Sequence, residues 1–265
     1  MATTKPAAKA APAKSKSTAV AVKKTGSIVS VAEIQARLKE QAAALADKVA
    51  PASGITIQVS QSKEFKFPDG TKADSFECVI VDFVSANYFY EGAYDKDNIT
   101  PPACFAIGSN PLQLVPSDNS PNKQNDTCKG CPMNEFGSSG KGKACKNSRV
   151  LAVLPPDASD DTPMWLLKVS PTAIKAFDSY VRSVASTFQM PPVAVVTTVS
   201  FDENCEYPSL RFGDPQANEN LGVHYARVAE AGELLATEPD VSQYEAAQTA
   251  KAPAKRPAAK TPARR

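Results

Sequence analysis

Four cysteines have a spacing that is typical of metal sites. Cys128 and Cys131 are separated by two residues, which lets two thiolates reach one metal ion from a single tight turn. Thirteen residues separate Cys131 from Cys145. We expect Cys104 to be the fourth ligand, because a metal would then hold both ends of the 104–149 segment, which is poor in apolar residues.

The other residues that could complete this site are Cys205, in a polar segment, and His224, the only histidine of the chain. Four thiolates favour Zn²⁺ in a tetrahedral site. Sulfur-only ligation and the Cys131-Pro132 pair also suit an iron–sulfur cluster, which is the alternative cofactor. Free thiols or a disulfide are the alternative to a metal, and we expect Cys78, within an apolar run, to be a core residue.

Basic residues accumulate around the same cysteines. Segment 104–149 contains six basic and three acidic residues. We expect five of the basic side chains to contact nucleic-acid phosphates: Lys129, Lys141, Lys143, Lys146 and Arg149. The run from Gly137 nearly matches a phosphate-binding P-loop, but Ala144 stands where that motif needs a hydroxyl, so an NTPase site is not expected.

Aromatic residues are concentrated just before this segment. Seven of the 19 aromatic residues fall within 76–105. Exposed rings on a sheet face can stack on bases, and we expect this role for Tyr88, Tyr90 and Tyr94. No combination of nucleophile and base typical of an enzyme is found, because His224 is the only imidazole and no serine-hydrolase or zinc-protease motif occurs.

The elements that must position these residues alternate strands with few helices. A capping box at Ser30 predicts a helix that ends at Pro51, and an apolar stripe predicts a helix after Ser170-Pro171 that ends near Phe188. A final helix is expected over 219–236. Strand patterns precede and follow the second helix: 55–59, 65–67, 76–84, 105–107, 150–154, 165–169, 193–201 and 207–212.

This order predicts a mainly β protein of the α+β class, with an OB-fold-like, five-stranded, partly open barrel. The Cys-rich, metal-binding segment 104–149 is an insertion in that barrel. We expect one globular domain over 27–235, flanked by disordered Ala/Lys/Pro-rich tails over 1–26 and 236–265.

The charge is distributed unevenly. Residues 1–26 and 246–265 hold twelve of the 30 basic residues and no acid, which leaves 18 basic and 28 acidic residues and a net charge of −10 in 27–245. Such tails can neutralise phosphates, or they can serve only to keep the protein soluble. No apolar run is long enough for a membrane span or a secretory signal, so we expect a cytoplasmic protein without a membrane partner.

Several segments resemble bacteriophage proteins that bind single-stranded DNA. The resemblance is carried by Cys128-Lys-Gly-Cys131-Pro, by Gly140-Lys-Gly-Lys-Ala-Cys145-Lys-Asn with the strand after it, and by stretches within 170–212. It covers the 76–214 region. It implies an OB-fold with a metal-stapled insertion, located in the cytoplasm of a bacterial host, with replication or recombination proteins as further partners.

The sequence therefore predicts a non-enzymatic protein that coats or protects single-stranded DNA by base stacking and phosphate contacts. Two alternatives remain open. One is a metal-dependent nuclease or another DNA-processing enzyme, in which carboxylates would bind Mg²⁺. The other is a zinc-knuckle regulatory protein.

Overall fold

A computed structural model describes Arg37, residues 55–92 and residues 100–244. The chain divides into two units, Met1–Ala50 and Pro51–Arg265, and the fold below is that of the second unit. All of the helix expected after Ser30 except Arg37 lies outside the described residues, as do the tail expected over 1–26 and residues 245–265. Within the described part, no helix is long and apolar enough to cross a membrane.

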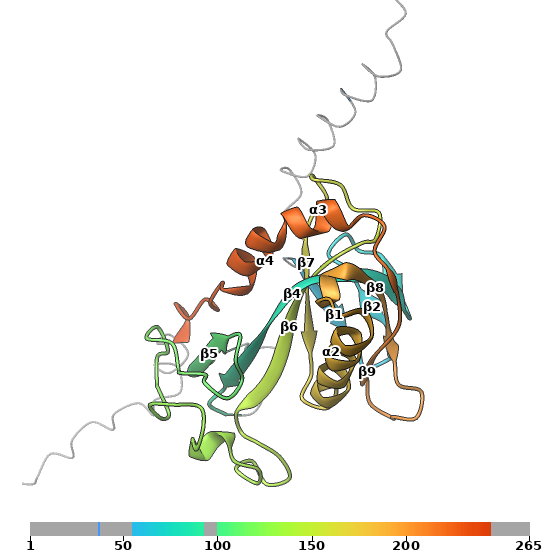
Figure 1. Ribbon diagram of the computed structural model, residues 1–265. Coiled ribbons are helices and arrows are strands. Elements are labelled where there is room, and N and C mark those ends of the chain that lie inside the picture. Colours follow the sequence, from blue (N-terminus) through green and yellow to red (C-terminus); the bar gives the residue numbers. More distant parts are fainter. Residues whose placement is uncertain (1–36, 38–54, 93–99, 245–265) are drawn as a thin grey trace, which may run out of the picture. The chain divides into compact units, whose positions relative to one another are not determined.

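The described residues form one curled, open sheet of nine strands, which makes the protein mainly β with a few helices (Figure 1). The strands lie in the order β3-β2-β1-β7-β6-β4-β8-β9, and β5 pairs with β4. Their bounds are β1 Thr56–Val59, β2 Phe65–Lys66, β3 Lys72–Ala73, β4 Phe76–Phe89, β5 Cys104–Gly108, β6 Lys146–Leu154, β7 Trp165–Val169, β8 Val195–Phe201 and β9 Leu210–Ala217. The helices are α2 Ile174–Phe188, α3 Leu221–Ala226 and α4 Val228–Leu235, with short 3-10 turns at Pro132–Asn134 and Pro192–Ala194.

The long strand β4 organises the sheet. One of its edges pairs antiparallel with β6 from Val79 to Tyr88. Its other edge is shared, because β8 pairs with the first part of β4 and β5 pairs with the last part, from Ser85 to Phe89. An irregularity in the β4–β6 register at Val81 bends the strand between these two parts. The insertion therefore begins and ends beside the C-terminal end of β4.

The two faces of the sheet are covered by different helices. The apolar stripe of α2 buries Phe177, Tyr180 and Val184 in the main core, which includes Leu151 and Val153 of β6. The intervening residues of β6, Ala152 and Leu154, pack instead with Ala231 and Leu235 of α4. This alternation is the two-residue period of a strand that is buried on both faces.

Several sequence predictions need correction. The sheet has nine strands in the described part, one more than the eight strand patterns in the sequence, because the two-residue strand β3 shows no such pattern. The expected 76–84 strand continues to Phe89, because Ser85 and Asn87 are polar but buried between β5 and β6.

Two helix boundaries also differ from the sequence prediction. Helix α2 begins at Ile174 rather than at Pro171, since the residues before it form a turn in which the Ala173 amide donates to the Ser170 carbonyl at 3.0 Å. The single helix expected over 219–236 is two helices that meet at Arg227, whose guanidinium binds Glu230 and the carbonyl of Thr162.

Candidate nucleic-acid interface and cysteine cluster

Strand register brings two of the four cysteines to the end of β4. The Cα atom of Cys104 on β5 pairs with that of Phe89, and Cys145 immediately precedes Lys146, which pairs with Tyr88. Residues that face each other across neighbouring strands share one face of a sheet. Cys104 and Cys145 therefore lie on opposite sides of Phe89, and their side chains are on the same face of the sheet as the Phe89 side chain.

The other two cysteines lie on a tight turn of the insertion. Gly130 adopts a φ of +77° between Cys128 and Cys131, a left-handed conformation that glycine tolerates best. Asn134 fixes the turn, because its side-chain amide donates to the Cys128 carbonyl at 2.9 Å and its backbone amide donates to the Cys131 carbonyl at 2.8 Å. The Cys145 amide donates to the Met133 carbonyl at 2.8 Å, which ties the turn to the start of β6.

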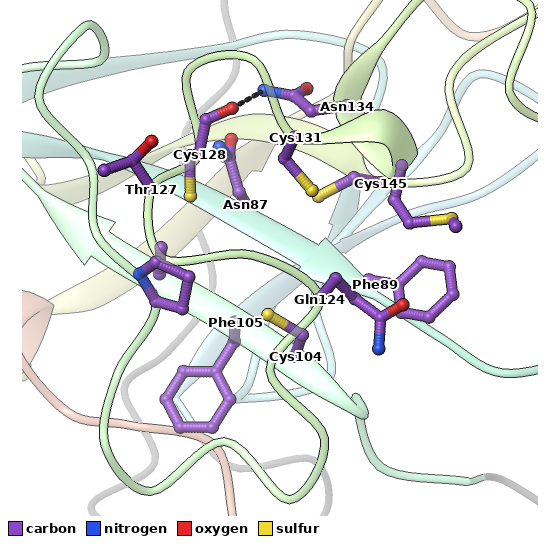
Figure 2. A pocket seen from close by; sticks show the side chains of 13 residues that line it. Asn87, Phe89, Cys104, Phe105, Gln124, Thr127, Cys128, Cys131, Asn134 and Cys145 are labelled. Carbon is purple, nitrogen blue, oxygen red and sulfur yellow. Dashed lines mark hydrogen bonds between the residues drawn. The ribbon is translucent and has the colours of Figure 1, made fainter.

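The four cysteines line one small space, which we call the cysteine hollow. It has a volume of about 20 Å³ and is also lined by Asn87, Phe89, Phe105 and Gln124. All four cysteines are between 7% and 9% exposed, and Figure 2 shows their side chains arranged around this space. Within the described residues, however, no three His, Cys, Asp or Glu side chains converge as a ready metal-binding group.

Neighbouring thiols raise the pKa of two cysteines of the hollow, Cys128 and Cys145. Burial raises the pKa of Cys145 to about 12, and the nearby Cys128, Cys104 and Cys131 add to this effect. Burial also raises the pKa of Cys128, while a hydrogen bond from the Asn87 side chain acts in the opposite direction. The Asn87 side-chain oxygen accepts a hydrogen bond from Asn147 at 2.5 Å, so its amide group is left to face Cys128.

The other candidate ligands lie elsewhere. Cys78 is in the main core, where burial raises its pKa to about 12. The Cys205 thiol contacts Asp202 at 3.6 Å in the loop between β8 and β9. His224 is fully buried, with its ring nitrogens 2.9 Å and 3.0 Å from the carbonyl oxygens of Asn220 and Pro155. None of the three lines the hollow.

A larger depression of about 620 Å³ lies between the insertion and α2, and we call it the basic groove. Its lining residues are Phe136, Gly142, Lys143, Cys145, Lys146, Asn147, Pro171, Thr172, Ile174, Lys175, Asp178 and Arg182. Phe136 is 80% exposed, which is unusual for so large an apolar side chain. Four lysine and arginine side chains line the groove: Lys143, Lys146, Lys175 and Arg182. Among the described residues, none of these four forms an ion pair with a carboxylate.

The one carboxylate of the groove lining is occupied within the fold. Asp178 of α2 accepts two hydrogen bonds from Arg149 of β6, at 3.1 Å and 2.9 Å. Arg149 is buried, so this guanidinium joins β6 to α2 and is not free for a phosphate. The groove consequently carries an excess of positive charge from Lys143, Lys146, Lys175 and Arg182.

The predicted contact residues are distributed unevenly around this groove. Lys143 and Lys146 line it, whereas the exposed Lys129 and Lys141 do not. Lys143 contacts the Asn134 side chain at 3.3 Å, and Lys146 donates to the Lys143 carbonyl at 3.0 Å.

Tyr88 and Tyr90, which were expected to stack on bases, do not line the groove either. The Lys168 ammonium lies 4.3 Å from the ring centre of Tyr88, so one face of that ring is covered. Burial raises the pKa of Tyr88 to about 12 and raises that of Tyr90, although the Tyr90 side chain is 40% exposed at the strand end. Tyr94 lies outside the described residues.

The sequence prediction missed Phe136, Lys175 and Arg182. Phe136 could have been noticed as a lone aromatic residue in a polar segment. Lys175 and Arg182 are seven residues apart, which places them on one face of a helix, but nothing in the sequence places that face beside the insertion. Comparison with protein-family models, with curated proteins and with solved structures found no match for this chain.

Proposed function

We propose that this protein binds single-stranded DNA in the basic groove and does not change it chemically. The observation that carries the proposal is the exposed Phe136 ring beside four cations that have no carboxylate partner in the described part. An aromatic ring offers a stacking surface to any base, and lysine and arginine side chains follow the phosphates. Such a surface suits a flexible single strand, whose bases are free to leave their stack.

The strand order supports the same proposal. Five neighbouring strands lie in the order β7-β6-β4-β8-β9. Strands β4, β6 and β7 form an antiparallel meander, β8 and β9 follow on the other side of β4, and α2 connects β7 to β8 along the chain. We infer that these five strands are an OB-fold, with β4 as its first strand. The insertion is then the loop between the first and second strands, which is one of the loops that OB-folds use to bind oligonucleotides.

A nuclease is less well supported than a binding protein. Metal-dependent cleavage of a phosphodiester needs carboxylates that hold Mg²⁺ beside the substrate. Of the described residues that line the basic groove, only Asp178 is a carboxylate, and both of its oxygens are bound to Arg149. The groove therefore has no free pair of metal ligands.

Fluorescence anisotropy tests the proposal with the full-length protein and labelled single-stranded and duplex oligonucleotides. Phe136→Ala should weaken single-strand binding by about 1–3 kcal/mol, or 5- to 150-fold, because one stacking surface is lost. Tyr225→Ala is the matched control, since Tyr225 is 66% exposed on α3 and does not line the groove.

We expect wild-type protein to prefer the single strand and the control variant to bind as wild type does. Equal affinity for both forms of DNA, unaffected by Phe136→Ala, would contradict the proposal and would assign the affinity to charge alone.

A further inference from the structure

The cysteine hollow lies beside the basic groove, but DNA binding does not by itself explain it. Four of the six cysteines of the chain line a space of about 20 Å³, and the structure records each of them as a free thiol. We propose that the four cysteines of the hollow bind one Zn²⁺ ion, and that this ion holds the insertion wall of the groove in place.

The size of the hollow and the type of ligand favour a single zinc ion. A space of 10–15 Å³ holds one water molecule, so the hollow of about 20 Å³ suits a single ion better than an iron–sulfur cluster of several atoms. Four sulfur ligands are one of the sets that tetrahedral Zn²⁺ takes in structural sites. The thiols do not converge on one point in this structure, and each cysteine has one rotatable side-chain bond, χ1, about which its sulfur can turn toward a shared ion.

The ligands are held by two kinds of support. Cys104 and Cys145 belong to the strand framework beside Phe89, and Cys128 and Cys131 belong to the Gly130 turn. Because the Cys145 amide also binds the turn through the Met133 carbonyl, both supports already face each other. An ion between them would cross-link the turn to the sheet.

The side chain of Asn87 gives the site an outer partner. Asn147 donates to the Asn87 side-chain oxygen at 2.5 Å, and Asn87 lines the hollow with Cys128, where its amide is placed to donate to the Cys128 sulfur. Hydrogen bonds of this kind orient metal ligands and stabilise the charge on sulfur, and their loss typically weakens metal affinity by about 10- to 100-fold.

The insertion has little regular structure or apolar packing to hold it. Between Gly108 and Cys145 the only regular element is the 3-10 turn Pro132–Asn134, and the buried apolar cluster there consists of Ala106, Leu114 and Cys128. A connection of this length without secondary structure needs another source of order. A metal would provide it by closing the chain between its four ligands.

The part of the inference that concerns the groove rests on the proposed function. Phe136 and Lys143 lie between Cys131 and Cys145, so a metal would fix both ends of the segment that carries them. Without the metal, that segment would lose its position relative to Lys175 on α2, and the groove would lose one wall.

Metal analysis of the full-length protein, produced with zinc and dialysed, tests the site directly. We expect one zinc ion per chain, loss of zinc in Cys128→Ser, and full retention in the control Cys205→Ser. Replacement by Co²⁺ in the wild type should give the intense visible bands of a tetrahedral thiolate site, which does not depend on a variant that folds poorly. Asn87→Ala should weaken zinc binding by about 10- to 100-fold.

Absence of bound metal and of the cobalt bands would overturn the proposal, as would iron with inorganic sulfide, or equal zinc in Cys128→Ser and wild type. A chelator should also speed tryptic cleavage after the exposed Lys129 and Lys141, because their segment would lose its fixed conformation, and it should reduce single-strand binding. Unchanged DNA binding after complete zinc removal would refute the link to the groove. Failure of the wild type to bind DNA at all would refute only the proposed function, because metal content is measured without DNA.

Discussion

Replacing Lys175 and Arg182 together with alanine should reduce the salt dependence of DNA binding by a predictable amount. Four cations line the basic groove, and both of these lie exposed on α2. Each phosphate that is neutralised on a single strand contributes about −0.7 to the slope of log K against log salt, so the double variant should lower the slope by about 1.4. The overall affinity should also fall, most strongly at low salt.

The measurement is a series of anisotropy titrations of the full-length protein at several salt concentrations. The terminal tails contribute equally to wild type and variant, so the difference in slope reports on the groove alone. The control is Lys66→Ala with Arg211→Ala, which removes two exposed cations that do not line the groove. Surface changes of this kind should alter stability by no more than about 0.5 kcal/mol, so both proteins should fold. An unchanged slope in Lys175→Ala with Arg182→Ala, or an equal loss in the control, would refute the assignment of the groove.

Three further predictions concern the packing that supports the groove, and each is checked by urea denaturation with the free energy of unfolding extrapolated to water. Phe177→Ala should destabilise the protein by about 3–5 kcal/mol, because the ring is fully buried against its neighbours on the sheet; a loss below 1 kcal/mol would contradict this packing. Asp178→Ala should cost about 1–3 kcal/mol, because it leaves the buried Arg149 without its partner; the reasoning fails if stability is unchanged. Tyr180→Phe should cost about 1–3 kcal/mol, because the buried Thr197 hydroxyl loses its partner at 2.7 Å; an equally stable variant would show that this hydrogen bond is unimportant.

The strands and helix α2 could be predicted largely from local pattern. Trp165–Val169 was expected with the bounds that the structure has, and the α2 stripe packs as its period indicates. The start of α2 was not predictable, because Ser170-Pro171 resembles a helix start but forms a separate turn. The end of β4 was missed for a different reason: Ser85 and Asn87 look like loop residues until β5 and β6 are placed on either side of them.

The candidate site, like the fold, could be predicted only in part from the sequence. The spacing of Cys128 and Cys131 is visible in the sequence, and Cys104 was chosen because it begins the insertion. The strand register places Cys104 and Cys145 on either side of Phe89, and both line the hollow. The basic groove was only half predicted. Lys143 and Lys146 belong to the insertion. Lys175 and Arg182 join them only because α2 packs on the sheet next to β6, and this contact joins distant parts of the chain.

Photochemical cross-linking of the full-length protein to a single-stranded oligonucleotide, followed by mass spectrometry of the peptides, tests the central claim most directly. Binding in the basic groove predicts cross-links to Phe136 and to peptides that contain Lys143 or Lys175, and their loss when unlabelled single strand competes. Cross-links confined to the exposed Tyr207 and Tyr225 or to the two basic tails would contradict the claim, because those residues do not line the groove.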